Sequence, residues 1–359
     1  MEREERQARL ALNAVPGLGP SSIRRLLEWA GSASAALTQC QHWPEAVRRQ
    51  TSSLEEEALR RLGREQEAWC LENKVEALIQ GQKAYPDRLE HLEHPPPVLF
   101  VLGQVEALQG SPLPFTVIGA RACTSYGRSQ AHRFGAGLAS RGAVVYSGGA
   151  RGIDQAALRG AVDHGGVAVA VLGSSLDRLY PAEIPALIEP ILEQGGAVVS
   201  EFPFGSQIRR GNFPRRNRLL AAFARGVLVV EATEKSGSMI TVGWALDLGR
   251  DVFALPGPVD SRASHGPIRL LREGAMAVND PGQIWQHYNL GEASDPDSSG
   301  AQTPLLALLH QGDHSLDSLA QALGQPPERV LLDLVELELK GRVIRLPGGA
   351  YHRCGPGGS

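Results

Sequence analysis

Five short segments of the chain carry residues that could bind a phosphate-rich ligand. They combine glycine or serine with polar or basic side chains, and they are Gly119–Gly127, Ser147–Asp154, Gly173–Pro181, Phe213–Leu220 and Lys235–Ser238. Small residues let a backbone approach an anion closely, N–H groups at a helix start donate to it, and arginine grips a phosphate with two parallel hydrogen bonds. Several such segments in one chain predict an anion-binding site built from loops.

The candidate ligands of this site come from four of the segments. They are Gly119, Arg121, Ser147, Gly148, Gly149, Arg151, Arg215, Arg216, Asn217, Arg218, Lys235, Ser236, Gly237 and Ser238. Each loop taken alone is equally consistent with an ordinary turn before a helix, or with a serine that caps the helix. Tyr180, in the remaining segment, could stack on a base, although an aromatic residue beside a proline is more often a packing residue.

The distribution of charge agrees with an anion site, although the formal net charge is only −3. No acidic residue lies between Glu201 and Glu231. That interval contains Arg209, Arg210, Arg215, Arg216, Arg218 and Arg225. Such a run is either a solvated face or an anion site. We expect Phe213–Leu220 to precede a helix at the centre of this run, where its arginines could line a groove for several phosphates.

Several common chemistries are excluded by missing motifs. None of the four lysines follows a glycine, so there is no Walker A loop, and no Gly-x-Gly-x-x-Gly supports standard dinucleotide binding. There is no Gly-x-Ser-x-Gly elbow and no His-Glu-x-x-His. The cysteines lie far apart, at positions 40, 70, 123 and 354. The sequence therefore predicts no metal, no cofactor and reduced thiols in a cytosolic protein.

The elements that must position these loops are short apolar runs that alternate with amphipathic segments. The runs are Val98–Leu102, Phe115–Gly119, Ala143–Tyr146, Val167–Gly173, Ala197–Ser200, Gly226–Glu231 and Val252–Leu255. This alternation predicts an α/β fold with a doubly wound parallel sheet covered on both faces. Ligands of such sheets lie beyond the carboxyl ends of the strands, which is where the candidate loops follow.

Two further modules flank this sheet domain, which we place at residues 76–288. The pattern of residues 1–75 predicts helices. Within it, Val15–Leu27 is similar to a helix–hairpin–helix, although a small helical bundle explains the pattern as well. A polar linker is expected at 289–302, followed by three helices and a hairpin at 303–359, which indicate a winged helix. The last of those helices carries four acidic side chains, so we expect it to repel phosphates and to serve in protein contacts or packing.

No apolar run is long enough to cross a bilayer, and the charged start is not followed by the apolar stretch of a signal peptide. We therefore expect a cytoplasmic protein that does not enter the membrane.

The motifs of residues 80–280 resemble, in order, those of the DNA-processing protein A family, also called the Smf family, of bacterial natural transformation. They are Tyr85–Leu89, Pro96–Gly103, Gly119–Arg121, Ser147–Asp154, Leu176–Pro181, Ser200–Gly205, Phe213–Arg218, Ser236–Thr241, Val252–Gly257 and Gly266–Ala275. The resemblance implies an extended Rossmann-like domain that binds single-stranded DNA and works as a homodimer. It also implies protection of incoming strands and help in loading the recombinase RecA despite single-strand-binding protein.

By the same resemblance, DNA contacts are expected from eight of the candidate ligands. They are Arg121, Gly148, Gly149, Arg216, Asn217, Lys235, Ser236 and Gly237. Three positions depart from the family pattern: Ala120 stands where serine is common, Ser175 where glycine is usual and Ile184 where asparagine is usual. The last two put the contribution of the Gly173–Pro181 loop in doubt. Ile268 and Leu271 are our expectation for the dimer interface, with burial inside one domain as the alternative.

Two competing functions remain open from the sequence. The first is a nucleotide-binding or nucleoside-phosphate-hydrolysing enzyme of the same Rossmann-like group. Such enzymes share a Pro-Gly-Gly-x-Gly-Thr-x-x-Glu loop, and the comparable stretch here, Lys235–Thr241, lacks the catalytic glutamate. The second is a pure protein scaffold, which would leave the cations of the loops without a role. We therefore expect a binding protein rather than an enzyme.

Overall fold

The computed structural model describes residues 2–51, 55–290, 304–309, 312, 314–339, 343–346 and 349–353. The chain divides into two compact units, Met1–Tyr288 and Asn289–Ser359. Most of the linker expected at 289–302 lies outside the described residues. The domain boundaries inferred from the sequence stay predictions.

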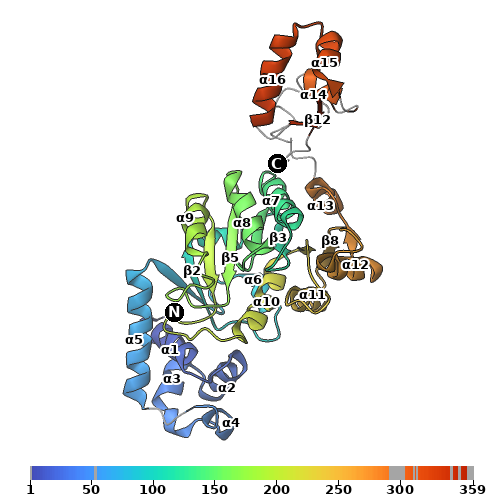
Figure 1. Ribbon diagram of the computed structural model, residues 1–359. Helices are drawn as coiled ribbons and strands as arrows, with labels where there is room; N and C mark the ends of the chain where they lie inside the picture. The colour runs from blue at the N-terminus through green and yellow to red at the C-terminus, as the bar shows by residue number, and fades with distance from the viewer. Residues whose placement is uncertain are drawn as a thin grey trace. The chain divides into compact units, whose positions relative to one another are not determined.

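A nine-stranded sheet forms the centre of the first unit (Figure 1). Its order is β1-β2-β6-β5-β4-β3-β7-β8-β9. The strands are β1 Val75–Ile79, β2 Val98–Gly103, β3 Pro114–Ile118, β4 Val144–Ser147, β5 Ala168–Leu172, β6 Ala197–Ser200, β7 Gly226–Val229, β8 Asp251–Ala254 and β9 Met276–Ala277. From β6 to β9 every neighbouring pair is parallel, as the apolar runs predict. The doubly wound arrangement is thus confirmed.

The edge formed by β1 and β2 departs from the expected parallel sheet. β2 pairs antiparallel with both β1 and β6. Parallel neighbours need a long crossover, usually a helix that covers the sheet. Between β1 and β2 the chain holds only α6 (Asp87–Glu90), which is a single turn. The expectation that Val98–Leu102 is a parallel strand is therefore wrong, because no covering helix separates it from β1.

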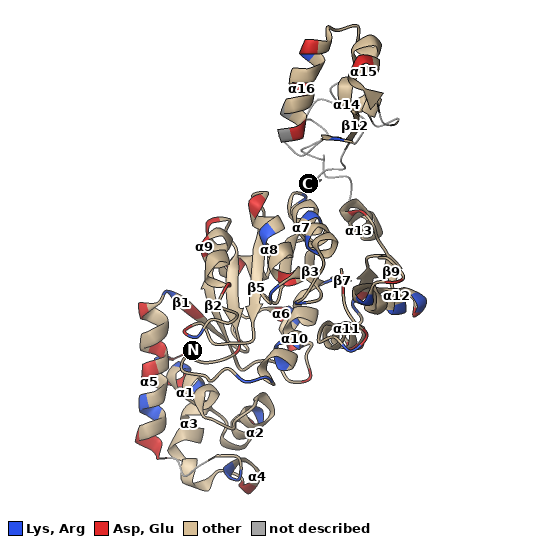
Figure 2. Ribbon diagram, viewed as in Figure 1, with Lys and Arg blue, Asp and Glu red and all other residues tan. Residues whose placement is uncertain are grey.

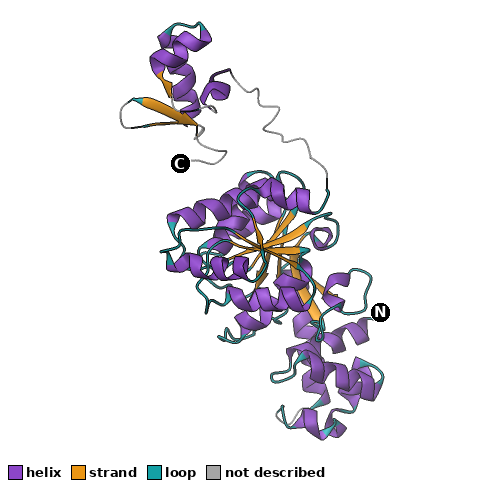
Figure 3. Cartoon of the chain, turned by 90° about the vertical axis from the view of Figure 1, so that its right-hand side faces the viewer, coloured by secondary structure: helices purple, strands orange, loops and turns teal. Residues whose placement is uncertain are grey.

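Helices cover both faces of the sheet (Figure 3). One layer contains α7 (Ser125–Ala139), α8 (Ile153–Asp163) and α9 (Pro185–Glu193), which pack side by side. The other contains α10 (Asn212–Phe223) against α6 and α11 (Ser238–Asp247). Also present are α12 (His265–Arg272), α13 (Pro281–His287) and the 3-10 turns η2 (Val105–Leu108) and η3 (Arg262–Ser264).

The order of the strands reverses between β3 and β7. From β3 the chain adds β4, β5 and β6 on one side, and from β7 it adds β8 and β9 on the other. The loops that leave β3 and β7 therefore diverge to opposite faces and leave a crevice between them. In open α/β sheets this crevice is where ligands bind. The strands beneath it are fully buried and rich in Val, Ile, Leu and Ala, which holds its floor rigid.

The helices that precede β1 pack as a layer against the β1 edge. The helices are α1 (Arg3–Ala14), α2 (Pro20–Ala30), α3 (Ala33–Thr38), α4 (Glu45–Arg48) and α5 (Glu56–Glu72), with the turn η1 (Cys40–His42). They enclose a small apolar core of their own. The Trp69 ring stacks on Phe204, 5.2 Å between centroids, and the Gln66 side chain bonds the Phe204 backbone. These contacts join the helical layer to the sheet.

The second unit is the winged helix that the sequence predicts. Its elements are α14 (Pro304–Leu309), α15 (Leu316–Leu323), α16 (Pro327–Leu339) and the strands β10 (His314–Ser315), β11 (Val343–Arg345) and β12 (Ala350–Arg353). The strands form a sheet of order β10-β12-β11 over a separate leucine-rich core. The turn expected at Pro347-Gly348 lies outside the described residues. Within the part of the chain that the structure describes, no helix is both long and apolar enough to cross a membrane.

Candidate nucleic-acid interface

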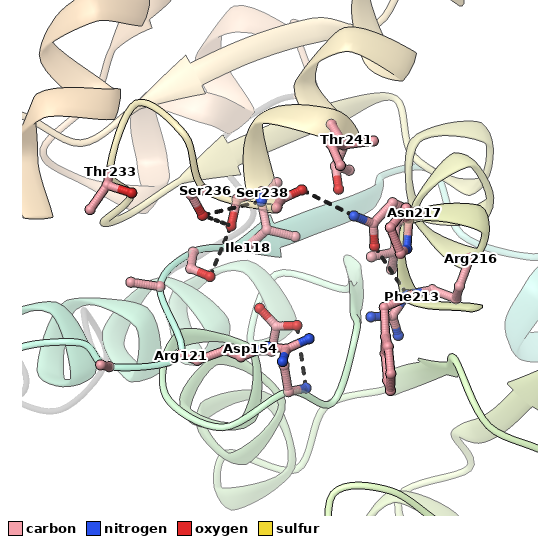
Figure 4. Close-up of a pocket in the computed structure, with 18 of the residues that line it drawn as sticks. Ile118, Arg121, Asp154, Phe213, Arg216, Asn217, Thr233, Ser236, Ser238 and Thr241 are labelled. Atoms are coloured by element: carbon pink, nitrogen blue, oxygen red, sulfur yellow. Dashed lines mark hydrogen bonds between the residues drawn. The ribbon is translucent and has the colours of Figure 1, made fainter. Parts of the chain in front are cut away.

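A cavity of about 680 Å³ opens at the carboxyl ends of β3 and β7, at the reversal point of the sheet. Its walls come from the turn after β3, from the start of α10 and from the loop that leads into α11 (Figure 4). These are three of the five segments that the sequence singles out. Tyr180 adds a side chain from a fourth, and Ala150 and Asp154 from the fifth. The topology thus brings the candidate loops together at one site.

Two exposed arginines and two aromatic rings surround the mouth of the cavity. The Arg121 guanidinium lies 5.3 Å from the centre of the Phe213 ring, and Phe213 packs against Tyr180 with 5.4 Å between centroids. Arg210 lines the same wall. Among the described residues, neither Arg121 nor Arg210 has a carboxylate within 4.0 Å. The mouth therefore offers positive charge and a ring face, which suit a phosphate and a base respectively.

Arg216 reaches the cavity from α10 and is almost fully buried. One of its terminal nitrogens donates to the backbone oxygens of Gly148, at 2.6 Å, and of Val171. Burial lowers its pKa to about 10, and the nearby Asp154 acts in the opposite direction. A side chain at Gly148 would collide with the Arg216 guanidinium and the Asp154 carboxylate. Glycine at 148 is therefore what lets this cation lie under the loop after β4.

Asp154 is the buried acid at the base of the cavity. It lies in the first turn of α8, and its carboxylate accepts a 3.4 Å hydrogen bond from the Ala150 N–H. Burial raises the pKa of Asp154 to about 6, against the opposing effect of the nearby Arg216. This carboxyl group therefore changes charge at about pH 6, beside the candidate ligand site.

The serine loop before α11 is held by hydrogen bonds within the protein. The Ser238 hydroxyl donates to the Gly119 oxygen at 2.9 Å, and the Asn217 amide donates to the Gly237 oxygen at 3.1 Å (Figure 4). Ser236 bonds both the backbone and the hydroxyl of Ser238. These side chains fix the β3 turn, α10 and the α11 loop relative to one another. Lys235 is exposed but does not line the cavity.

The amino terminus of α7 is occupied by a carboxylate from the protein itself. Glu231, two residues after β7 and 4% exposed, accepts hydrogen bonds from the Thr124 N–H at 2.8 Å and from its hydroxyl. A side chain at Gly127 would overlap this carboxylate. In dinucleotide-binding sheets the helix after the first strand of the switch point holds the pyrophosphate. Here that position is filled.

The structure does not bring Arg215 and Arg218 into the cavity. Both donate to the buried Glu201 carboxylate, Arg215 with bonds of 2.8 and 3.0 Å. The expectation that Phe213–Leu220 is a loop before a helix is also wrong, because these residues form the first turns of α10. Helical geometry sends residues 215 and 218 to the side opposite 213, 216 and 217. Glu201, at the edge of the acid-free interval, thus neutralises two of its arginines.

Three further candidates support the site without facing its main cavity. Ser147 is fully buried and donates to the Val117 oxygen at 2.7 Å, which ties β4 to β3. Gly149 has φ +66°, and a side chain there would strike Ile184 and Leu172. Arg151 is exposed and forms an ion pair of 2.7 Å with Glu183. It lines a smaller cavity of about 270 Å³ that shares Arg121, Phe213 and Arg216 with the main one.

Arg210 and Phe213 belong to the site but were not among the sequence candidates. The signal for Arg210 was its place in the acid-free interval, and for Phe213 its position three residues before Arg216, on the same helical face. Of the departures from the family pattern, Ser175 is fully buried and its hydroxyl lies 3.5 Å from the Ser206 oxygen. Ile184 packs beneath Gly149. Ala120 lines the cavity with a methyl group in place of a hydroxyl.

Two other expectations receive no direct test. Leu271 of α12 packs partly against the core of its own unit, and Ile268 is half-buried. Their role in a dimer stays a prediction. Across the described ranges, no group of three or more His, Cys, Asp or Glu residues could hold a metal ion.

Comparison with protein families places both units. The profile described as DNA recombination-mediator protein A matches residues 76–289, and the profile described as the DprA winged helix domain matches residues 291–349. Protein Smf of Escherichia coli is 39% identical over 294 residues, which cover 78% of each chain. A putative DNA processing protein DprA of Mycobacterium tuberculosis is 42% identical over 259 residues, or 69% of this chain and 66% of that one.

Solved structures agree with these relatives. DNA processing protein A from Streptococcus pneumoniae superposes with a TM-score of 0.62 at 29% identity, over 79% of this chain and 98% of the other. The protein of the same name from Helicobacter pylori, solved to describe its single-stranded DNA binding mode, superposes at 0.54 and 29% identity, over 60% and 95%. The chain belongs to the DNA recombination-mediator protein A family, also known as DprA or Smf.

Proposed function

We propose that this protein binds and protects single-stranded DNA in the β3–β7 cavity, without catalysing a reaction on it. The observation that carries the proposal is the cavity mouth itself. Arg121, Arg210 and Arg216 all line this cavity. Among the described residues, neither Arg121 nor Arg210 forms an ion pair with a carboxylate. The Tyr180 and Phe213 rings stand beside these cations. Charge for the backbone and ring faces for the bases are the two components of single-strand binding sites.

The geometry supports a single strand rather than a duplex. A concave site at the end of a sheet can take separate phosphates while the bases turn into gaps, whereas a duplex is read by an element that enters its groove. The helix α16 of the winged helix would be such an element. However, it carries the acidic residues Glu328, Asp333 and Glu338 and the basic residue Arg329, so its charge would oppose a phosphate backbone. We therefore assign the winged helix to protein contacts or packing.

The same geometry argues against a nucleotide-hydrolysing enzyme. Glu231 occupies the amino terminus of α7, so the usual pyrophosphate position of the fold is closed to an anion. Ser238 and Asn217, which could have activated or oriented a substrate, are engaged in holding loops together. Burial raises the pKa of Asp154 to about 6, and we assign this carboxyl group to tuning the charge of the site.

The family supports further roles within the same proposal. The matched description, recombination mediator, supports a role in loading RecA onto strands that single-strand-binding protein covers. The Helicobacter pylori relative, which binds single-stranded DNA, supports the choice of ligand. We include a cytoplasmic homodimer, with Ile268 and Leu271 at its interface, in the same proposal. No cofactor is part of it.

Fluorescence anisotropy of a labelled oligothymidylate and of a matching duplex, each titrated at several salt concentrations, tests the proposal. We expect tight, salt-sensitive binding to the single strand and weak binding to the duplex. Binding to neither would reject it, and nucleoside monophosphates would then be the next ligands to screen. Faster RecA assembly on a protein-covered single strand is the expected result for the loading role.

A further inference from the structure

A second basic groove lies on the outer helical layer, away from the β3–β7 cavity. It encloses about 320 Å³ between α7, α8 and α9. Arg128 and His132 line it from α7, Arg159 from α8, and Glu183 stands at the start of α9. Figure 2 shows basic positions along α7 and α8 in this layer. The proposed function does not use this groove.

The charge of the groove is positive once its ion pairs are counted. Glu183 is held by Arg151 at 2.7 Å, and the hydrogen bond from Arg151 lowers the pKa of Glu183. His132 forms a hydrogen bond of 3.1 Å with Asp163, which does not itself line the groove. Neither Arg128 nor Arg159 has a carboxylate within 4.0 Å among the described residues. Two arginines thus face the groove without a counter-charge.

The groove begins where the main site ends. Arg151 lines the smaller cavity that shares Arg121 with the main site, and its partner Glu183 lines the groove. Gly152 also lines the groove, and a side chain there would strike the Arg121 backbone oxygen. From Gly152, α8 carries the groove residues Gln155, Ala156 and Arg159 on one face. Arg159 therefore lies roughly 10 Å along the helix from the edge of the main site.

We propose that this groove is a second phosphate-binding segment for the same single strand, which leaves the β3–β7 cavity past Arg151 and runs along α8 to Arg159. The inference rests on the proposed function and adds a path to it. The ligand is the phosphodiester backbone, because the residues that line the groove include two arginines but no Phe, Tyr or Trp. A short strand fills only the cavity, whereas a longer strand also reaches Arg128 and Arg159.

The double variant Arg128→Gln/Arg159→Gln tests this path with oligothymidylates of about 4 and about 16 nucleotides. Each arginine that meets a phosphate contributes about 0.7 to the slope of log affinity against log salt, so the long strand should lose about 1.4 in slope and bind roughly tenfold more weakly near 0.15 M salt. The short strand should bind as it does to the unchanged protein. The matched control is Arg61→Gln/Arg64→Gln on α5, which removes the same charge from exposed positions.

The outcomes separate the two proposals. If the unchanged protein binds both strands and the double variant binds the long strand equally well, the path along α8 is rejected, and the groove is open to an acidic protein segment instead. Equal losses for both strands would also reject it, because the arginines would then act through the cavity or the fold. If the unchanged protein binds neither strand, the proposed function fails first, and this inference fails with it.

Discussion

Both sides of α10 carry arginine, but the two sides use it for different purposes. On one side Phe213, Arg216 and Asn217 face the β3–β7 cavity. On the other, Arg215 and Arg218 bind the buried carboxylate of Glu201. The pocket side turns Arg216 toward the cavity, whereas the Glu201 side uses its two arginines within the fold. An arginine cluster in a sequence is thus not one functional unit, because helical geometry divides it.

The difference between the sides lies in what compensates the charge. Glu201 accepts hydrogen bonds from two guanidinium groups on one oxygen, while its other oxygen has no hydrogen-bond partner among the described residues. Arg216 instead donates to backbone oxygens, and although Asp154 lies nearby, no carboxylate of the described residues forms an ion pair with it within 4.0 Å. A ligand anion therefore complements Arg216 on the pocket side, whereas the arginines on the Glu201 side already have a carboxylate. Substitutions on the two sides should therefore separate stability from DNA affinity.

The largest expected effect is on stability, from Glu201→Ala. Removing this carboxylate leaves Arg218, which is nearly buried, without its partner. Breaking a buried pair on one side costs about 3–5 kcal/mol of unfolding free energy. Urea unfolding followed by tryptophan fluorescence measures it, because all five tryptophans lie in the first unit. Single-strand affinity of the folded protein should change little.

Glu45→Ala provides the comparison for that experiment. Glu45 forms an ion pair with Arg49 in which both side chains are exposed, and such surface pairs contribute little. Its unfolding midpoint should match that of the unchanged protein. If Glu201→Ala instead kept its stability and lost DNA affinity, the Glu201 side of α10 would belong to the interface.

The next effect is on affinity and contrasts Arg121 with Arg215. Arg121→Ala removes an exposed cation that lies over the Phe213 ring, so it should weaken single-strand binding by about 1.5 kcal/mol, or roughly tenfold, with the urea midpoint unchanged. Arg215→Ala removes an equal charge from the Glu201 side. It should keep affinity within about twofold, since its partner is a carboxylate and not DNA. Anisotropy titrations in parallel measure both, and equal losses would erase the distinction between the sides.

A smaller effect is expected from pH through Asp154. Its pKa lies at about 6 in the free protein because of burial. A bound polyanion favours the uncharged carboxyl and raises this pKa further, so the complex holds the proton to higher pH than the free protein does. Affinity for oligothymidylate should therefore fall as pH rises above about 6, by up to roughly tenfold for each unit by which the strand raises the pKa.

Asp154→Asn checks the assignment of that pH dependence. The variant cannot titrate, so its affinity should stay level between pH 6 and 8. Oligothymidylate has no group that titrates in this interval, and no histidine lines the cavity among the described residues. If the affinity of the variant still fell as pH rises, a group other than Asp154 would take up the proton on binding.

Much of the fold followed from the sequence because its signals are local. Apolar runs such as Ala197–Ser200 and the helix Ile153–Asp163 coincide with β6 and α8. The antiparallel β1–β2 edge did not follow, because strand direction depends on the connection and not on the residues of the strand. β1 itself was missed, since Glu76 interrupts a run of only five residues.

The site was predictable as a set of loops but not as a set of contacts. Its loops converge because they follow parallel strands, and that rule is available from the sequence. Which arginine meets a ligand depends on long-range partners, such as Glu201 for Arg215 and Glu183 for Arg151. Glu231 accepts a hydrogen bond from the Thr124 N–H at the start of α7, and these two residues are 107 positions apart in the sequence. No local pattern around Glu231 indicates it.

The smallest expected effect concerns the winged helix. Residues 2–288 enclose their own cores and contain both sides of α10, so a chain that ends at residue 288 should fold and keep single-strand affinity within about twofold. Glu328, Asp333 and Glu338 on α16 would oppose a phosphate backbone, so the removed unit has little affinity to contribute. Fluorescence anisotropy with the long oligothymidylate measures the affinity of the shortened chain and of the full chain in parallel. A loss of tenfold or more would mean that the winged helix holds DNA despite its acidic helix, and that the cavity is only part of the binding site.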